Sequence, residues 1–165
     1  MGLRRIVRHL LTTHWQLRRV FAPATLAAIE SAIHDGEALH SGQVRFAVES
    51  ALHGGRLLRN RGARQRALEV FAGLHMWDTE QRNGILIYLL LADRAVEIVV
   101  DRGAHRQVDP QVWQRICRQM ESDFRAGRYR EGVLNGIQAV TQAMSGPFPA
   151  TGTPSRELPD APVVI

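Results

Sequence analysis

Residues 84–100 read GILIYLLLADRAVEIVV, and this stretch decides the fold. Its first part, Gly84 to Leu91, is a continuous apolar run, which is typical of a central strand covered on both faces of a sheet. A short polar join at residues 92–94 leads into a second β-rich run, Ala95 to Val100. Because a parallel return needs a dozen residues or more, so short a join predicts an antiparallel hairpin.

Outside this hairpin, one more strand and several helices are indicated. Apolar residues alternate with Arg45 and Glu49 between Gln43 and Glu49, which predicts a strand with one buried face. Apolar residues at helical spacing occur before and after the strands. The expected helices run from Pro23 to Gly36, through Ala67 to Leu74, from Pro110 to Gly127 and from Tyr129 to Met144.

This order of elements predicts an α/β fold in which a small sheet lies between two helical layers, a three-layer α/β/α sandwich. The expected strands are Val44–Glu49, Ile85–Leu91 and Val96–Val100, with a fourth strand that the pattern does not locate. A length of 165 residues suits one domain. We expect a basic amphipathic N-terminal helix at 1–20, the domain at 21–146 and an extended, Pro-rich tail at 147–165.

The N-terminal segment carries the whole net charge of +5. All 21 basic residues are arginines, and residues 1–29 contain five of them and no acid. On a helical wheel, Leu3, Ile6, Val7, Leu10, Leu11 and Leu17 share one face. Two interpretations stay open, attachment to an anionic membrane surface or a protein partner, and packing of this face on the protein's own core. Under the first, the binding residues are Arg4, Arg5, Arg8, Arg18 and Arg19.

No secretory leader is expected, because arginines interrupt the apolar residues at the start of the sequence, and no apolar run is long enough to span a bilayer. This predicts a cytoplasmic location, with attachment to the inner face of the membrane as one hypothesis. Motifs of nucleotide-binding loops, nucleophile-elbow hydrolases and zinc sites are absent. Cys117 falls on the buried face of a predicted helix, which favours an inert thiol. His105 is expected in a loop beside Asp101.

Arginines also gather at residues 56–66, namely Arg56, Arg59, Arg61, Arg64 and Arg66. Such a cluster can contact phosphates, but no aromatic residue is interleaved with it. A solvated face therefore explains it better than a nucleic-acid site, and nucleic acid is not favoured as a partner.

Acidic residues gather where the predicted strands begin and end. Asp78 and Glu80 precede the central strand, and Asp101 follows the last one. Antiparallel neighbours place these positions at one end of the hairpin, where carboxylates and the amide carbonyl of Asn83 would suit Ca²⁺ or Mg²⁺. Asp93 lies at the opposite end and should not share the site. The alternative is a set of ordinary solvated loop acids.

Several motifs resemble those of the TPM-domain family, in the right order and with the right gaps. They are PATLAAIESAI (23–33), QVRFAV (43–48), RNGILIYLLLADRAVEI (82–98), the glycine at 103 and FRAGRYREGVLNGI (124–137). The resemblance covers about Pro23 to Met144. It implies an α/β/α sandwich around a small mixed sheet and, for some relatives, binding of divalent cations and acid phosphatase activity.

Two positions depart from the family pattern. Arg82 precedes Asn83-Gly84 where relatives commonly carry an acid, and His105 stands in place of a glutamate. Both changes remove acidic groups from the expected ion-binding end of the hairpin. The favoured hypothesis is therefore a non-catalytic binding or accessory domain, peripheral to the membrane. The alternative is a Ca²⁺- or Mg²⁺-dependent acid phosphatase.

Overall fold

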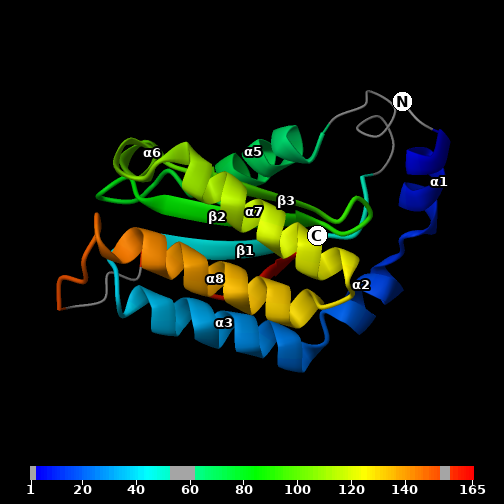
Figure 1. Cartoon of the computed structure of the whole chain (residues 1–165), viewed down its shortest axis with the longest axis horizontal. Coiled ribbons are helices and arrows are strands. Elements are labelled where there is room, and N and C mark those ends of the chain that lie inside the picture. Colours follow the sequence, from blue (N-terminus) through cyan, green and yellow to red (C-terminus); the bar gives the residue numbers. More distant parts are fainter. Residues whose placement is uncertain (1–2, 53–61, 153–156) are drawn as a thin grey trace.

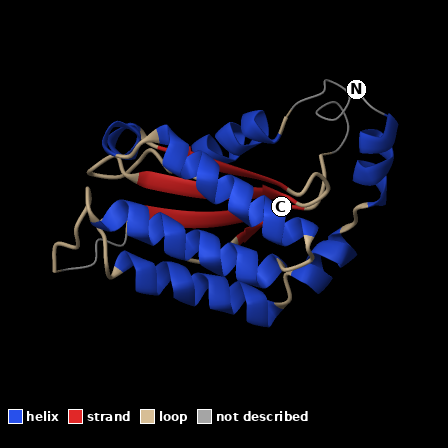
Figure 2. Ribbon diagram, in the orientation of Figure 1, coloured by secondary structure: helices blue, strands red, loops and turns tan. Residues whose placement is uncertain are grey.

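The computed structural model describes residues 3–52, 62–152 and 157–165, and within them helices pack on both faces of one sheet (Figure 2). The elements in chain order are α1 (Leu3–Leu11), α2 (His14–Val20), α3 (Pro23–Glu37), β1 (Gln43–Glu49), α5 (Ala63–Gly73), β2 (Gly84–Leu90), β3 (Ala95–Val100), α6 (Arg102–Gln107), α7 (Pro110–Arg125), α8 (Tyr129–Ser145) and β4 (Val163–Val164).

The sheet is mixed, with strand order β3-β2-β1-β4 (Figure 1). β2 and β3 form the antiparallel hairpin expected from the sequence, with Ile87 opposite Ile98. β1 runs parallel to β2, in a register that pairs Val44 with Ile85. The predicted α/β/α sandwich and its three strands are confirmed, with strand ends that differ by a residue. The strand that the pattern did not locate is β4, which pairs in parallel with the outer edge of β1.

Strand alternation divides the core between the two faces of the sheet. In β2, Ile85, Ile87 and Leu89 point to the face covered by α3, α7 and α8, where α2 also contributes Leu17. The alternate β2 residues point to the face covered by α5 and by part of segment 157–165. Every β2 side chain is therefore buried.

The α5 face contains a buried polar network within its apolar surroundings. The Tyr88 hydroxyl donates a hydrogen bond of 2.7 Å to Glu49 Oε2, and Arg66 Nε donates to the same oxygen at 2.7 Å. Arg66 also contacts Glu69 at 3.1 Å. Burial raises the pKa of the Tyr88 hydroxyl, so this group remains protonated and keeps its role as donor. The network fixes α5 against β1 and β2.

The N-terminal segment forms two helices where the sequence predicted one. The chain leaves helical geometry at Thr13, which is extended at φ −105° and ψ 160°. The Thr13 side chain accepts from the N–H of Gln16, and the Gln16 side chain accepts from the N–H of Thr13. This capping box starts a new helix because it satisfies two backbone donors that a continuous helix would have bonded otherwise.

One further expectation about local structure is corrected. His105 lies in helix α6 and not in a loop, because the side chain of Asp101 accepts from the N–H of Arg102 and caps this helix. In the Pro-rich tail expected at 147–165, residues 157–165 lie along the sheet and include β4. Residues 53–62, whose glycines and Asn60 predict a loop, lie mostly outside the described residues.

Gly84 offers a test of how tightly β2 packs at its start. A Cβ atom at this position would lie 1.9 Å from the backbone oxygen of Met76, which is itself buried. We expect Gly84→Ala to lower the free energy of unfolding by about 3 kcal/mol, because the backbone must move to relieve the overlap. Gly146→Ala is the matched control, since no atom lies within 4 Å of its added Cβ. Equal urea-denaturation midpoints for the two variants would contradict this prediction.

Candidate functional site

Asp93 anchors the first helix to the rest of the domain. It lies in the turn between β2 and β3, and its carboxylate accepts from Arg5 Nε at 3.1 Å and from the guanidinium of Arg8. His9 Nε2 lies 3.1 Å from the same carboxylate. Burial alone would raise the pKa of Asp93, but the hydrogen bonds from Arg5 and Arg8 hold it below its ordinary value. One turn acid thus holds three side chains of α1.

His9 links α1 to the end of β1 as well. Its side chain is fully buried, and Nδ1 accepts a hydrogen bond of 3.0 Å from the N–H of Leu52. The acceptor role of Nδ1 places the ring proton of the neutral imidazole on Nε2, which faces Asp93. Burial lowers the pKa of His9 despite the nearby carboxylate of Asp93, so the neutral ring is the stable form in the folded protein.

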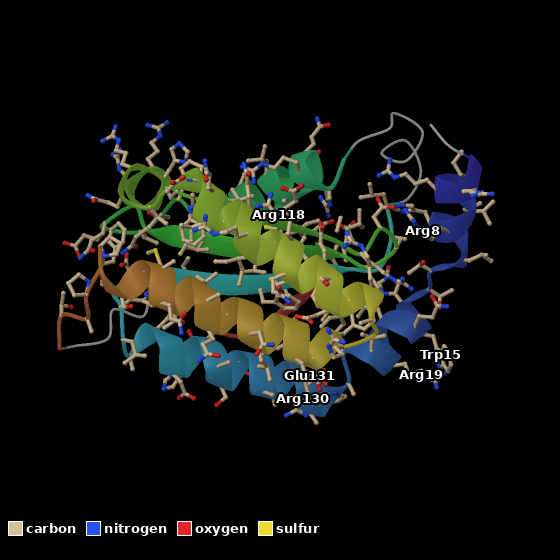
Figure 3. All side chains as sticks on the ribbon, in the orientation of Figure 1. Arg8, Trp15, Arg19, Arg118, Arg130 and Glu131 are labelled. Carbon is tan, nitrogen blue, oxygen red and sulfur yellow. The ribbon has the colours of Figure 1, made fainter. Side chains whose placement is uncertain are left out.

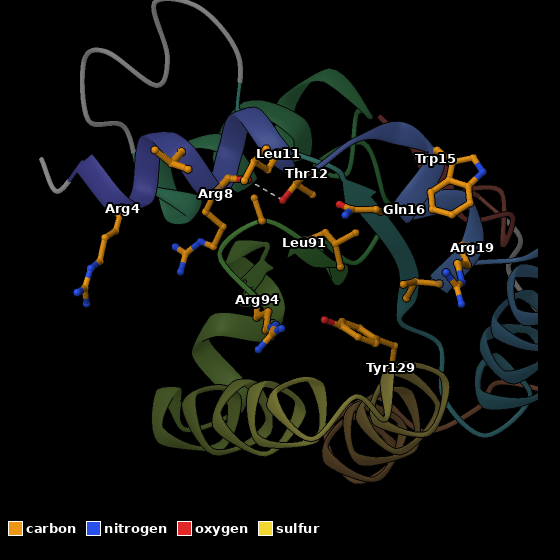
Figure 4. Close-up of a pocket in the computed structure, with 13 residues that line it drawn as sticks. Arg4, Arg8, Leu11, Thr12, Trp15, Gln16, Arg19, Leu91, Arg94 and Tyr129 are labelled. Carbon is orange, nitrogen blue, oxygen red and sulfur yellow. Dashed lines mark hydrogen bonds between the residues drawn. The ribbon is translucent and has the colours of Figure 1, made fainter.

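A groove of about 860 Å³ lies between helices α1 and α2 and the turn of the β2–β3 hairpin (Figure 4). We call it the N-terminal groove. In Figure 4, Arg4, Arg8 and Arg94 are directed toward the same open space, and Tyr129 faces it from α8. Leu91 and Ala92 also line it, and both are buried. Four arginines contribute to its wall, the fourth being Arg19, which lies 5.7 Å from the centre of the Trp15 ring.

The apolar face predicted for residues 1–20 is only partly used by the core. Leu17 is buried, and Ile6 packs half-buried against the α5 side of the sheet. Val7, Leu10 and Leu11 are exposed, the last two at 71% and 67%, and Trp15 is exposed at 67%. Figure 3 shows Arg8, Trp15 and Arg19 at the end of the molecule formed by α1 and α2. The core-packing interpretation therefore holds for Leu17 and Ile6, whereas Val7, Leu10 and Leu11 do not pack on the core.

The predicted basic residues also divide into two groups. The Arg5 side chain is 20% exposed and is bound to Asp93. Arg4, Arg18 and Arg19 are exposed, and Arg8 is half-exposed while it contacts Asp93.

Sequence reasoning missed the groove residues that come from elsewhere in the chain, because they sit in the hairpin turn and in α8. They are Leu91, Ala92, Arg94 and Tyr129. Nothing in their local pattern indicates proximity to α1.

The predicted ion-binding residues meet at the other end of the hairpin. Asp78, Glu80 and Asp101 line one cavity of about 610 Å³, as the sequence suggested, and Asp93 does not take part. Arg82 and Arg102 line the same cavity. In the described part of the chain, no three His, Cys, Asp or Glu side chains are placed to hold one metal ion together. The donor set of this cavity thus does not fit a three-ligand cation site.

Asn83 connects two neighbouring segments through hydrogen bonds to Ser41 and Thr79. Its side-chain amide donates to Ser41 O at 3.0 Å, and its backbone N–H donates to Thr79 Oγ1 at 3.1 Å. Its Oδ1 is buried and has no hydrogen-bond partner among the described residues. Asn83 therefore offers one carbonyl oxygen, yet it is not among the residues that line the cavity.

The remaining candidates have local structural roles. Burial raises the pKa of the Cys117 thiol to about 11, which agrees with an inert side chain. Arg66 is bound within the Glu49 network, and Arg64 donates to Ile98 O at 2.8 Å. Arg56, Arg59 and Arg61 lie outside the described residues.

The sequence matches the family model of the TPM domain over residues 16–143. The chain belongs to the TPM-domain family. No curated protein matches the sequence. The TPM domain resembles the NMR structure of the BA42 protein from the psychrophilic bacterium Bizionia argentinensis, with a TM-score of 0.75 and 27% identity, over 86% of this chain and 93% of BA42.

A second structure similar to this TPM domain is the N-terminal domain of a P. gingivalis protein. It has a TM-score of 0.62 and 20% identity, over 77% of this chain and 78% of that one, and it shows the fold alone. The family model begins at residue 16 and so does not include α1. No helix in residues 3–52, 62–152 or 157–165 has both the length and the apolar character needed to cross a membrane.

The His9 contact predicts a pH dependence of stability for this TPM domain. Burial lowers the pKa values of both His9 and His40 in the folded state. Below the ordinary pKa of 6.5, the unfolded chain therefore binds more protons than the folded chain. The stability that the neutral rings contribute is fully present above this pH. It is lost as the pH falls toward the lowered pKa values of the folded state. We expect the melting temperature to decrease from pH 7.5 to pH 5.

The matched variant is His9→Gln, whose side-chain oxygen can still accept from the Leu52 N–H but does not titrate in this range. We expect a weaker decrease of melting temperature with pH for this variant, with the remainder due to His40. An identical pH profile for the wild type and His9→Gln would show that His9 does not contribute.

Proposed function

We propose that this TPM domain is a non-catalytic binding domain that attaches peripherally to an anionic membrane surface through α1 and α2. One observation carries the proposal. Exposed apolar side chains and exposed arginines occupy the same end of the molecule, around the N-terminal groove. Amphipathic helices of this composition lie in the interface of anionic bilayers, with their apolar side chains inserted among the lipids.

Charge supports the attraction to such a surface. The net charge of +5 resides in residues 1–29, because the acids and arginines of the remaining chain balance. Arg4, Arg18 and Arg19 are exposed on α1 and α2, and Arg94 adds a cation from the hairpin turn. Each arginine near an anionic leaflet contributes about 1 kcal/mol, and salt screens this attraction within a Debye length of roughly 8–10 Å.

Apolar exposure supports insertion beyond the charged headgroups. Of the eight large hydrophobic residues that are exposed in the described chain, four fall within nine residues of sequence, namely Val7, Leu10, Leu11 and Trp15. Single exposed apolar residues are common on protein surfaces, whereas a contiguous group of them marks an interaction site. Trp15 suits the membrane interface in particular, because its ring is apolar and its N–H remains able to bond water or headgroups.

The Asp93 contacts support a surface that is already ordered before binding. Arg5, Arg8 and His9 hold α1 against the hairpin turn, so α1 does not need to fold on contact with lipid. Pre-organisation lowers the entropic cost of binding. Deleting residues 1–20 is therefore a poor test of the proposal, because it would also remove Leu17 from the main core.

Point variants in the full chain test the proposal by co-sedimentation with vesicles. We expect the wild type to pellet with phosphatidylglycerol-containing vesicles, to remain in the supernatant with phosphatidylcholine vesicles, and to release partly at high salt. Arg4→Gln combined with Arg19→Gln should weaken partitioning about 30-fold, because two contributions of about 1 kcal/mol are lost. Trp15→Ala should reduce the part of the binding that resists salt.

The matched control neutralises two exposed arginines of α7 that do not line the N-terminal groove, Arg115→Gln with Arg118→Gln, the second of which is labelled in Figure 3. It makes the same change in net charge and should retain most of the binding. Equal losses in the two double variants would assign binding to net charge alone. A wild type that stays in the supernatant with both lipids would refute the membrane proposal.

A second candidate function is the Ca²⁺- or Mg²⁺-dependent acid phosphatase that the family resemblance implies. It is favoured by one observation, the convergence of Asp78, Glu80 and Asp101 on one cavity. Arg82 and Arg102 in the same cavity oppose it, because their positive charge disfavours a cation. For this reason we rank the phosphatase below the binding domain.

Restoring an acid before Asn83 tests this ranking. We expect Arg82→Asp to bind Ca²⁺ at least about tenfold more tightly than the wild type in calorimetry, because a repelling charge becomes a potential ligand. Asp101→Asn in that background should reverse the gain. Asp also tolerates the left-handed backbone of this position, φ 52°, better than most residues. Tight Ca²⁺ binding together with cation-dependent hydrolysis of a phosphomonoester by the wild type would favour the phosphatase instead.

A further inference from the structure

The N-terminal groove combines positive charge with apolar surface. None of its thirteen described lining residues is acidic. Cations gather where α1 faces the hairpin turn, since Arg4, Arg8 and Arg94 are directed toward one space (Figure 4). Apolar side chains form much of the remaining lining, namely Val7, Leu11, Trp15, Val20, Leu91 and Ala92. One ligand in this groove can therefore contact guanidinium groups and apolar side chains together.

Two of these cations are not used by the rest of the domain. The side chains of Arg4 and Arg94 are exposed and form no hydrogen bond or ion pair with another described residue. Arg8 differs, because its guanidinium already contacts Asp93. Two uncompensated positive charges match a phosphomonoester, which carries a charge of about −1.5 to −2 at pH 7. Guanidinium groups also bind phosphate oxygens through pairs of parallel hydrogen bonds.

Tyr129 brings a fixed hydroxyl to the same groove. Its ring stacks on Phe124 with 5.2 Å between the ring centres and meets the Phe21 ring edge-on at 6.3 Å. Both phenylalanines are buried, so the core holds the tyrosine ring in place. The hydroxyl has no hydrogen-bond partner among the described residues and is directed toward the side of the groove where Arg94 lies (Figure 4). It is therefore a donor already oriented for a ligand.

The backbone at Arg94 does not account for an arginine in the hairpin turn. This residue has φ 50°, in the left-handed region that glycine and asparagine adopt at lower cost. A hydrogen bond of 3.0 Å from its N–H to Leu91 O helps to hold the turn. Because strained backbone conformations cluster at ligand sites, an arginine here points to a role for its side chain in the groove.

We propose that the N-terminal groove binds one anionic single-chain amphiphile, a lipid with a phosphomonoester head group and one alkyl chain. The head group lies among Arg4, Arg8 and Arg94. It accepts a hydrogen bond from the Tyr129 hydroxyl, and the chain lies along Leu91 and the apolar residues of α1 and α2. The groove volume of about 860 Å³ falls within the roughly 300–1,000 Å³ of small-molecule sites. This assignment rests on the proposed function, because it gives a specific lipid ligand to the surface that contacts the membrane.

Isothermal titration calorimetry with dodecyl phosphate below its critical micelle concentration tests the proposal. We expect saturable binding of one molecule per chain. Inorganic phosphate should bind at least about 100-fold more weakly, because it has no alkyl chain to bury. Dodecyl maltoside should bind at least about tenfold more weakly, because it has no charge. Equal affinity for dodecyl maltoside would reduce the site to apolar contacts, and equal affinity for inorganic phosphate would make it a site for free anions. Either result would overturn the proposal.

Two variants place the ligand in the groove. Tyr129→Phe removes only the hydroxyl, keeps the ring on Phe124 and should weaken binding of dodecyl phosphate about tenfold. Arg94→Asn should weaken it at least about tenfold, and asparagine suits the left-handed turn. Arg115→Gln with Arg118→Gln on α7 is again the charge control and should leave the affinity unchanged. Unchanged affinity in Tyr129→Phe and in Arg94→Asn, with wild-type circular dichroism, would place the ligand elsewhere and refute the groove site.

Vesicle co-sedimentation separates the groove site from peripheral attachment. Tyr129→Phe retains the arginines and exposed apolar residues of α1 and α2, so it should sediment with phosphatidylglycerol-containing vesicles as the wild type does. A wild type that sediments but does not bind dodecyl phosphate would leave attachment standing and refute the groove site. A wild type that binds dodecyl phosphate but stays in the supernatant would keep the groove site and refute attachment. In sedimentation velocity, a dimer that dodecyl phosphate does not dissociate would identify a second copy as the occupant and refute the lipid.

Discussion

The rest of the structure depends on the burial of β2 on both faces. Every side chain of Gly84–Leu90 is out of contact with water, so both faces of the sheet must be covered. The chain meets this constraint with α3, α7 and α8 on one face and with α5 and part of 157–165 on the other. The tight packing at Gly84, where a Cβ would overlap the backbone of Met76, follows from the same constraint.

The candidate binding surface depends on contacts between the β2–β3 turn and helix α1, which are far apart in the sequence. Asp93 lies 88 residues from Arg5, yet their side chains meet at 3.0 Å. These contacts remove Arg5 from the solvent and orient α1 so that Val7, Leu10 and Leu11 stay exposed. The basic and apolar character of α1 is a property of its local sequence. Which of its residues bind the domain and which remain exposed is decided by the tertiary structure.

The opposite end of the hairpin combines acids and arginines in one cavity. Asp78, Glu80 and Asp101 line this cavity together with Arg82 and Arg102. Two guanidinium groups among three carboxylates reduce the negative potential that a divalent cation requires. Because function depends on such sites and not on the fold, family membership alone does not assign an activity to this chain.

The sequence by itself determined the elements whose signals are local. The apolar run of 84–91 and its short join specified the hairpin, and Asp109 with Pro110 specified the start of α7, where Asp109 accepts from the Gln111 N–H at 2.8 Å. The positive charge of residues 1–29 also follows directly from the sequence. Only the tertiary structure decided that Asp93 holds α1, that Arg94 and Tyr129 join the groove, and that residues 163–164 complete the sheet. These contacts join residues far apart in sequence, and their geometry arises only when both faces of the sheet are packed.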